Sequence, residues 1–269
     1  MKLCRFQPML LEAAAVGRAG TTVRPAPRWG IIEGESVREL AGDVFGEWKP
    51  GERAWPLVAV KLLPPVTPSK IVCLGRNYRE HAVELGHALP IEPLLFLKPP
   101  SAVIGPDEPI VLPPASQRVD YEGELAVVIG RRCGQLAEAD DVRPCILGFT
   151  CLNDVTARDL QKKDVQFTRA KGFDTFCPLG PAVETGLDWA AATIETFVNG
   201  RRKQAARTTE MIFPVDVIIR WVSHVMTLEP GDVIATGTPS GVGPLAPGDV
   251  VEVIVSGIGT LRNPVIAQG

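Results

Sequence analysis

Two acidic residues, Glu122 and Glu124, stand at the start of an apolar run that has strand character. Side chains alternate along a strand, so both carboxylates should share one face, about 7 Å apart, with the small Gly123 between them. A hard divalent cation would relieve their repulsion. The next apolar run also ends in an acid, Asp154, which could join them. Three carboxylates plus waters suit octahedral Mg²⁺ or Mn²⁺, and the Cys and His ligands typical of zinc are missing here.

The Glu-x-Glu pattern is common, however, and taken alone it equally fits a solvated edge strand. The metal site is favoured over that alternative only by the other segments that accompany it in the chain.

A possible acid–base pair follows an expected strand that stops at Gly75. On a helix over residues 78–85, His81 and Glu84 are three residues apart and lie on the same face. A carboxylate beside an imidazole orients it and raises its basicity, which a water-activating general base needs near neutral pH. An ordinary exposed helix face offers the same spacing, so this pair also depends on its context.

Two later segments combine charged, hydroxyl and small residues. Residues 169–176 contain Lys171, which could neutralise an anionic substrate or intermediate or could be a surface lysine. Residues 236–243 end a strand with hydroxyls and backbone amides that can bind a carboxylate, although a tight turn has the same composition. The segment lacks Gly-Lys-Ser/Thr, which excludes a nucleotide P-loop.

The composition excludes several classes of protein. The 269 residues are 45% hydrophobic, enough for one large domain with or without a small appendage. Scattered basic residues, 28 against 31 acidic ones, argue against nucleic acid as a partner and remain compatible with a small anionic substrate. No apolar run approaches ~20 residues, and the first residues do not resemble a signal peptide, so no membrane segment is expected. Six cysteines without a Cys-x-x-Cys pair indicate free thiols in a reducing compartment, by default the cytoplasm.

Frequent turn-forming residues, 26 Gly and 25 Pro, break the chain into short apolar runs and favour a strand-rich fold with few helices. We expect a small N-terminal domain over residues 1–66 and a catalytic domain over residues 67–269. The expected elements are a hairpin over 28–40, a short helix near 53–63, a stiff linker over 64–68, strands at 70–74, 94–97, 103–104, 110–112, 124–129, 146–153, 233–235 and 250–255, a hairpin turning at Asn199-Gly200, and a helix from Pro214 to about Met226.

Taken in order, six segments resemble the fumarylacetoacetate hydrolase (FAH) family, and the likeness covers roughly residues 67–265. They read Gly-Arg-Asn-Tyr at 75–78, Phe-Leu-Lys-Pro at 96–99, Asp-Tyr-Glu-Gly-Glu-Leu at 120–125, Asn-Asp-Val-Thr-Ala-Arg-Asp at 153–159, Lys-Gly-Phe-Asp at 171–174 and Thr-Gly-Thr-Pro at 236–239. The 96–99 segment matches the shorter bacterial and mitochondrial branch and not the founding branch, which adds an upstream aspartate ligand. Ser256 stands where relatives often have Glu.

The resemblance implies an α+β, mainly β fold with a mixed β-roll catalytic domain, a small β-rich N-terminal domain and a homodimeric assembly. It also implies roles for individual residues. These are Mg²⁺ or Mn²⁺ ligands at Glu122, Glu124 and Asp154, an acid–base dyad at His81 and Glu84, an active-site lysine at Lys171, and substrate contacts at Arg76, Tyr78, Gln161 and Thr238.

The activity that follows is hydrolysis of a carbon–carbon bond in a 3-acylpyruvate-type keto acid. In that reading the metal holds the 2-oxo acid end, His81 activates water against the distal carbonyl, Lys171 stabilises the oxyanion, and cleavage leaves pyruvate enolate on the metal. Decarboxylation of oxaloacetate-like acids and isomerisation of 2-hydroxyhepta-2,4-dienedioate in aromatic catabolism would use the same enolate. A family member that binds metal or ligand without turnover is a further alternative.

Overall fold

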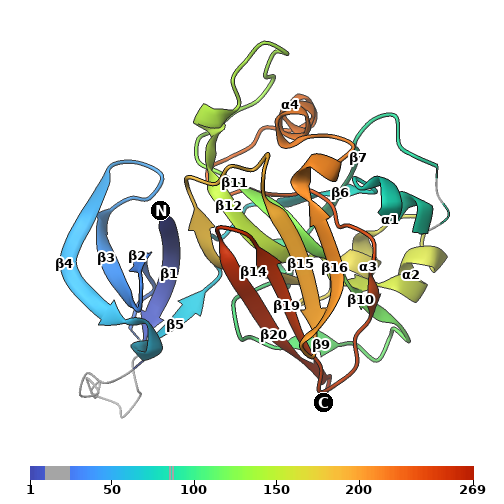
Figure 1. The fold of residues 1–269 in the computed structure, drawn as a ribbon, viewed down its shortest axis with the longest axis horizontal. Helices are drawn as coiled ribbons and strands as arrows, with labels where there is room; N and C mark the ends of the chain where they lie inside the picture. Colours follow the sequence, from blue (N-terminus) through green and yellow to red (C-terminus); the bar gives the residue numbers. More distant parts are fainter. Residues whose placement is uncertain (10–24, 85, 87) are drawn as a thin grey trace.

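The computed structural model describes residues 1–9, 25–84, 86 and 88–269, and these form the mainly β fold with few helices that the sequence predicts (Figure 1). Within the described residues, the largest sheet has 12 strands. Ten of them follow the order β4-β3-β2-β1-β14-β12-β11-β17-β6-β7, while β5 pairs with β1 and β8 with β14. The strands are β1 (Lys2–Pro8), β2 (Arg28–Glu33), β3 (Ser36–Gly42), β4 (Trp48–Pro56), β5 (Val60–Leu63), β6 (Ile71–Gly75), β7 (Leu94–Lys98), β8 (Val103–Ile104), β11 (Gly123–Ile129), β12 (Ile146–Asn153), β14 (Cys177–Glu184) and β17 (Val233–Ala235).

The centre of this sheet is buried on both faces, which explains its nearly continuous apolar runs. Along β11, Leu125, Val127 and Ile129 enter one hydrophobic cluster, whereas Ala126 and Val128 enter another on the opposite face. The strand is therefore clamped between two cores. The packing on both faces therefore also fixes the position of the acidic motif, Glu122 and Glu124, at the start of the strand.

Two smaller sheets complete the part of the chain that follows β5. One has the order β16-β15-β19-β20-β9 and the other β13-β10-β18. Their strands are β9 (Ile110–Leu112), β10 (Val119–Tyr121), β13 (Thr156–Ala157), β15 (Thr193–Val198), β16 (Arg201–Arg207), β18 (Gly243–Pro244), β19 (Val250–Val255) and β20 (Gly259–Ala267). In β19 every second residue is buried, the alternation expected of a sheet with one covered face.

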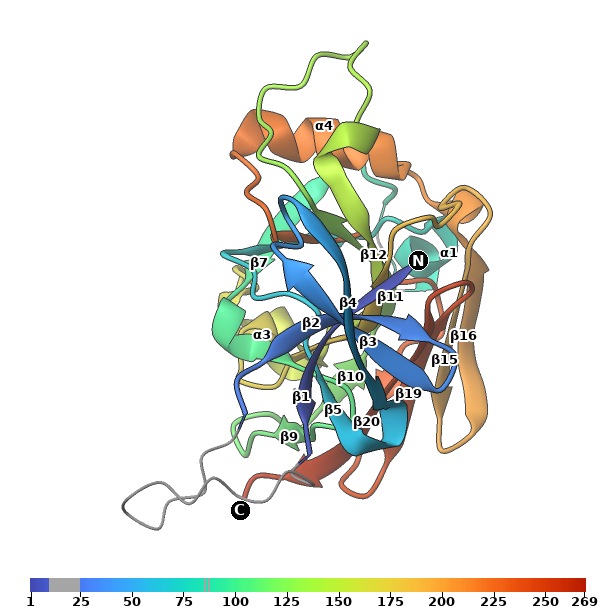
Figure 2. The same cartoon turned by 90° about the vertical axis from the view of Figure 1, so that its left-hand side faces the viewer.

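The N-terminal strands β1 to β4 form a separate-looking unit at the left of Figure 1, and Figure 2 views the molecule from that side. They nevertheless continue the main sheet, because β1 pairs with β14 through Lys2↔Glu184 and Leu3↔Val183. Leu3 and Ile31 also join the cluster that packs against one face of β11. This unit therefore extends the main sheet beyond β14 and adds residues to its hydrophobic core.

Four α-helices are described: α1 (Arg79–Glu84), α2 (Arg158–Lys163), α3 (Thr168–Lys171) and α4 (Val215–Val225). The sequence predicts that α4 begins at Pro214, and the structure begins it one residue later, with Pro214 at the N-cap. Its buried residues Val215, Ile218, Ile219 and Val222 recur at helical spacing and cover one face of the sheet. The short 3₁₀ helices are η1 (Leu57–Ala59), η2 (Pro100–Ala102), η3 (Arg143–Cys145) and η4 (Thr208–Glu210).

Most expected elements are confirmed, but the expected helix over 53–63 is wrong. That stretch contains the end of β4, the turn η1 and then β5. Residues 60–63 pair antiparallel with β1, from Val60↔Pro8 to Leu63↔Arg5. Strand pairing with the distant β1 therefore outweighs the local helical preference of these residues. The helix expected over 78–85 begins one residue later, and Leu85 lies outside the described residues. All six cysteines are free and buried, as expected.

Candidate active site

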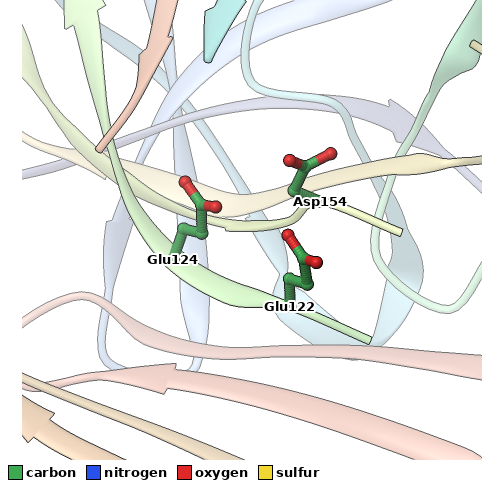
Figure 3. A group of neighbouring side chains, drawn as sticks. All are labelled: Glu122, Glu124 and Asp154. Atoms are coloured by element: carbon green, nitrogen blue, oxygen red, sulfur yellow. The ribbon is translucent and has the colours of Figure 1, made fainter. Parts of the chain in front are cut away.

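Glu122, Glu124 and Asp154 lie close together where β11 begins beside the end of β12. Gly123 pairs with Asn153, the Asp154 amide donates to the Glu122 carbonyl (2.8 Å), and the Glu122 amide donates to Asn153 Oδ1 (2.9 Å). One ligand oxygen from each carboxylate lies within 4.8 Å of the others, and all three residues are buried. Figure 3 shows the three carboxylate groups gathered in one place. We call Glu122, Glu124 and Asp154 the carboxylate cluster.

Three buried cations surround this cluster. Lys171, the last residue of α3, donates to Glu122 Oε2 (2.9 Å) and Asp154 Oδ2 (2.5 Å). Lys98, at the end of β7, donates to Asp154 Oδ1 (2.6 Å) and to the Val155 carbonyl (3.1 Å). Arg158, the first residue of α2, donates to Glu122. Glu122 and Asp154 are thus neutralised by the protein itself.

Arg158 is held by a further acid. Its Nε donates to Asp120 Oδ2 (2.9 Å), and its Nη1 donates to Gln161 Oε1 (2.7 Å). Lys98, Arg158 and Asp120 are site residues that the sequence pattern alone does not identify. The available signal is a charged residue at the end of an apolar strand, as at Lys98.

Glu124 differs from its two neighbours because, among the described residues, it pairs with no Lys or Arg. Its partner is the Gly237 amide, which donates to Oε2 (2.7 Å). Burial, together with the charges of Asp154 and Glu122, raises the pKa of Glu124 well above its usual range. Burial also raises the pKa of Glu122, but Lys171 and Arg158 outweigh it and hold that pKa well below its usual range.

This donor set fits a hard divalent cation. Carboxylate oxygens are the ligands that Mg²⁺ and Mn²⁺ prefer, and a cation would compensate the one buried carboxylate that the described cations leave unpaired. The observation that carries the fit is therefore Glu124, buried with an amide as its partner.

His81 and Glu84 face each other on α1. Glu84 Oε2 lies 3.2 Å from His81 Nδ1, and the Gly241 amide donates to both Glu84 oxygens (3.1 and 3.3 Å). The imidazole is buried, whereas the Glu84 side chain is 34% exposed. The contact through Nδ1 leaves Nε2 for proton transfer. We call His81 and Glu84 the imidazole pair.

A single cavity of about 410 Å³ joins the two groups. Most residues that the sequence assigns to the site line it: Arg76, His81, Glu84, Glu122, Glu124, Gln161, Lys171 and Thr238. Phe96 also lines it, and the Lys171 ammonium lies 4.8 Å from the centre of that ring. Asp154 is fully buried behind this lining.

Tyr78 is the exception among the expected substrate contacts. It lines a neighbouring cavity of about 280 Å³ together with Arg79, Glu80 and Ser240, and not the cavity of the carboxylate cluster. Its hydroxyl is buried without a hydrogen-bond partner among the described residues. Burial raises the pKa of Tyr78 far above its usual value.

The amides of the 236–243 segment serve carboxylates of the protein itself. The Gly237 amide binds Glu124 and the Gly241 amide binds Glu84. The Thr238 hydroxyl is also engaged, because it donates to the Gly123 carbonyl (2.9 Å). This loop therefore orders both groups of the site, in addition to lining the cavity. Ser256 lies in the exposed turn between β19 and β20, where its hydroxyl accepts a hydrogen bond from the Thr193 amide.

Comparison with known proteins gives matches along nearly the whole chain. The family model described as fumarylacetoacetate (FAA) hydrolase C-terminal matches residues 70–266, and the model described as Rv2993c-like, N-terminal matches residues 18–65. Protein Rv2993c of Mycobacterium tuberculosis is 51% identical over 237 residues, which cover 87% of this chain and 89% of that protein. The mitochondrial oxaloacetate tautomerase FAHD2B of Bos taurus is 44% identical over 224 residues, 78% of this chain and 71% of that protein.

Several solved structures cover the chain completely, among them the following two. The 2-hydroxyhepta-2,4-diene-1,7-dioate isomerase from Mycobacterium marinum is 46% identical, with a TM-score of 0.87 over 100% of this chain and 99% of that one. Maleylpyruvate hydrolase from Sphingobium sp. SYK-6, in complex with manganese(II) ion and pyruvate, is 29% identical, with a TM-score of 0.79 over 100% of both chains. No described helix of the present chain is long and apolar enough to cross a membrane.

Proposed function

The chain belongs to the fumarylacetoacetate hydrolase family, and from that premise we propose that it interconverts the keto and enol forms of a small 2-oxo dicarboxylic acid of the oxaloacetate type. The observation that carries the proposal is the single cavity lined by both the carboxylate cluster and the imidazole pair. An enolisation needs a group that stabilises the enolate and a base that moves the proton, and this cavity brings the two together.

Mg²⁺ or Mn²⁺ held by Glu122, Glu124 and Asp154 would supply Lewis-acid stabilisation of the charge that develops on the 2-oxo oxygen. The neighbour solved with manganese and pyruvate supports this choice of ion and of ligand class. Lys171 lines the same cavity and donates hydrogen bonds to both Glu122 and Asp154. Phe96, packed beside Lys171, helps to exclude water from that side.

The imidazole pair would carry the proton. Glu84 holds His81 through Nδ1, so Nε2 would take a proton from the carbon next to the 2-oxo group and deliver it to the oxygen of the resulting enolate, which gives the enol. The Gly241 amide fixes Glu84 in turn. Arg76 and Gln161, which also line the cavity, would bind the second carboxylate of the substrate.

Hydrolysis of a 3-acylpyruvate is the second candidate, and the same His81–Glu84 contact favours it. An imidazole oriented by a carboxylate can equally take a proton from water, so that the hydroxide attacks the distal carbonyl. Cleavage of the carbon–carbon bond then releases pyruvate enolate as the leaving group. Decarboxylation of oxaloacetate would also produce pyruvate enolate, and isomerisation of a hydroxydienedioate would pass through an enolate of that substrate. The two candidates differ in whether water enters the reaction.

The test is a substrate panel of oxaloacetate, a 3-acylpyruvate and a hydroxydienedioate, each with Mg²⁺, with Mn²⁺ and with EDTA. We expect metal-dependent decay of the enol absorbance of oxaloacetate, without release of pyruvate, and loss of that activity in His81→Asn. Fast pyruvate release from the acylpyruvate would establish hydrolysis in its place. Turnover that persists in EDTA would contradict both candidates.

We also propose a homodimer in the cytoplasm. The edge strand β7 exposes Leu94 and Leu97, and Ile91 next to it is almost completely exposed, which suits a contact between copies. Free buried thiols suit a reducing compartment. Size-exclusion chromatography with light scattering should give about twice the 28.9 kDa chain mass, and a value equal to one chain would refute the dimer.

A further inference from the structure

Strand β11 loses its neighbour β17 at the end where Glu122 and Glu124 of the carboxylate cluster lie. On one side β11 pairs with β17 only from Ala126↔Ala235 to Val128↔Val233. Beyond Ala235 the chain continues with one more contact, from the Thr236 amide to the Leu125 carbonyl, and then leaves the sheet. The peptide groups of Gly123, between the two glutamates, therefore need partners other than the backbone of β17 on this side.

The buried side chain of Gln204 supplies them. Its Oε1 accepts the Gly123 amide (3.0 Å), while its Nε2 donates to Thr238 Oγ1 and to the Pro239 carbonyl (both 2.8 Å). The Thr238 hydroxyl closes the ring by donating to the Gly123 carbonyl. One side-chain amide thus replaces the missing strand and links β11 to the 236–243 loop.

A bulge in the β15–β16 hairpin delivers this side chain. Thr196 pairs with Gln204 but the next residue, Phe197, pairs with Arg202, so Lys203 is the extra residue. The loop then packs tightly on this bulge: a Cβ at Gly241 (φ +96°) would stand 2.1 Å from the Lys203 carbonyl oxygen. On the other side, a Cβ at Gly123 would stand 2.0 Å from Thr196 Oγ1. Both glycines are required by close approach to this hairpin.

The loop that Gln204 anchors holds both halves of the site. Its Gly237 amide binds Glu124 of the carboxylate cluster, and its Gly241 amide binds Glu84, which holds His81. Gln204 also grips Gly123, which lies between Glu122 and Glu124. It therefore has a hydrogen-bonded connection to each half, although it does not line the cavity itself.

We propose that Gln204 is a positioning residue that sets the placement of the imidazole pair relative to the carboxylate cluster. The inference rests on the proposed function only for its effect on turnover, because the connection itself is independent of the reaction. Removing the amide orphans the Gly123 amide and lets the loop move, and a displacement of about 1 Å at a site of this kind can cost on the order of 10²-fold in rate. The carboxylate cluster keeps its own ladder to β12, so its metal affinity should change far less.

The experiment compares Gln204→Met with Asn263→Leu. Asn263 is the matched control because it is a buried amide that donates to two carbonyls, those of Gly105 and Glu108, and it does not line the cavity. Three quantities are measured: amide hydrogen exchange in residues 119–125 and 236–243 of the metal-free protein, Mn²⁺ affinity by calorimetry, and kcat and KM on the panel substrate that the wild type converts.

For Gln204→Met we expect exchange in both segments to accelerate about tenfold or more. We also expect kcat to fall about 10- to 100-fold, with KM and Mn²⁺ affinity within about threefold of the wild type. Asn263→Leu should leave exchange in these segments and kcat unchanged. If Gln204→Met does not fold, Gln204→Asn, whose amide is one methylene too short to span Gly123 and Thr238, takes its place with the same expectation.

Unchanged exchange at 236–243 would overturn the inference whatever the turnover, and so would accelerated exchange with an unchanged kcat. Equal effects of the two substitutions would reduce Gln204 to a structural role and overturn it too. If the wild type converts no panel substrate, the proposed function fails, and the exchange result alone then decides whether Gln204 holds the loop.

Discussion

The carboxylate cluster and the imidazole pair line one cavity but are held by different kinds of structure. The cluster lies at the ends of two central strands, and its side chains are at most 6% exposed. Three buried cations surround it. The pair lies on α1, a helix of six residues, and its outer member Glu84 is 34% exposed. Its restraints are the side-chain contact of 3.2 Å and the Gly241 amide, which donates to both Glu84 oxygens at 3.1 and 3.3 Å.

This difference separates two demands on the site. Burying a charge in a sheet costs much free energy unless opposite charges and hydrogen bonds compensate it, so the cluster should tolerate few substitutions. The pair, which must change protonation state and meet the substrate, is anchored through a loop and should tolerate substitution without loss of fold. Substitutions in the cluster should therefore affect metal binding, stability and turnover together, whereas those in the pair should affect turnover alone.

The largest effect is expected for Glu124→Gln, which keeps the shape and the acceptor for the Gly237 amide but removes the charge. Turnover should fall on the order of 10³-fold or more, and the affinity for Mn²⁺, measured by calorimetry, should fall at least about tenfold. The amide isostere separates charge from packing. Unchanged Mn²⁺ affinity would remove Glu124 from the ligand set.

The same variant makes a pH prediction for the metal-free fold. Because the pKa of Glu124 is raised in the folded protein, its ionisation destabilises the wild type as pH rises, whereas glutamine does not titrate. In EDTA, Glu124→Gln and the wild type should unfold at nearly equal temperatures below pH 4.5, the ordinary pKa of the carboxyl, and the variant should unfold at a higher temperature at pH 8. Saturating Mg²⁺ should reverse the order at pH 8. A variant less stable than the wild type in EDTA at pH 8 would contradict this account.

The next effect is on stability, for Lys98→Met. The Lys98 ammonium is completely buried on Asp154, so its removal leaves a buried carboxylate with one cation fewer and should cost about 3–5 kcal/mol of unfolding free energy. Urea denaturation in EDTA measures it. Arg202→Met removes a surface ion pair of ordinary length, Arg202–Glu195 at 2.9 Å with the arginine 61% exposed, and should cost less than about 1 kcal/mol. Equal losses of unfolding free energy in the two variants would show that the buried Lys98–Asp154 pair stabilises the fold no more than a surface ion pair does.

In the imidazole pair we expect a smaller effect that is confined to turnover. Glu84→Gln keeps an acceptor for the Gly241 amide but loses the charge that orients and supports His81. Then kcat should fall about 10- to 100-fold, while Mn²⁺ affinity and the unfolding temperature stay near those of the wild type. Loss of Mn²⁺ affinity in this variant would mean that the two groups are not held separately.

The same division decides what the sequence can predict. The period of a strand puts Glu122 and Glu124 together, and the run after them predicts β11, because these are local properties. The hairpin at Asn199-Gly200 is equally local, and both residues have the positive φ that the turn requires. The expected helix over 53–63 is wrong because pairing with β1, more than 50 residues away, has no local signal.

Non-local contacts also explain the missed parts of the site. The Gly241 amide reaches Glu84 across 157 residues, and Gln204 reaches Gly123 across 81. Lys98 and Asp154 are separated by 56 residues, and which of the scattered lysines would be buried depends on how strands of the sheet are ordered. Residue types could be read from the sequence, but these pairings required the fold.

The smallest effect should be that of Arg76→Met, at the edge of the cavity. Arg76 follows β6 with a left-handed backbone (φ 60°), is partly exposed, and has no acidic partner among the described residues. Its charge should help to bind the second carboxylate of a dicarboxylic substrate, an exposed interaction worth about 1 kcal/mol, so KM should rise about fivefold with kcat unchanged. The increase should shrink at high salt, because exposed charges are screened. A monocarboxylic acylpyruvate should show no such increase. An equal rise in KM for both substrates would place Arg76 on the carboxylate that they share, next to the cluster and not at the distal part of the cavity.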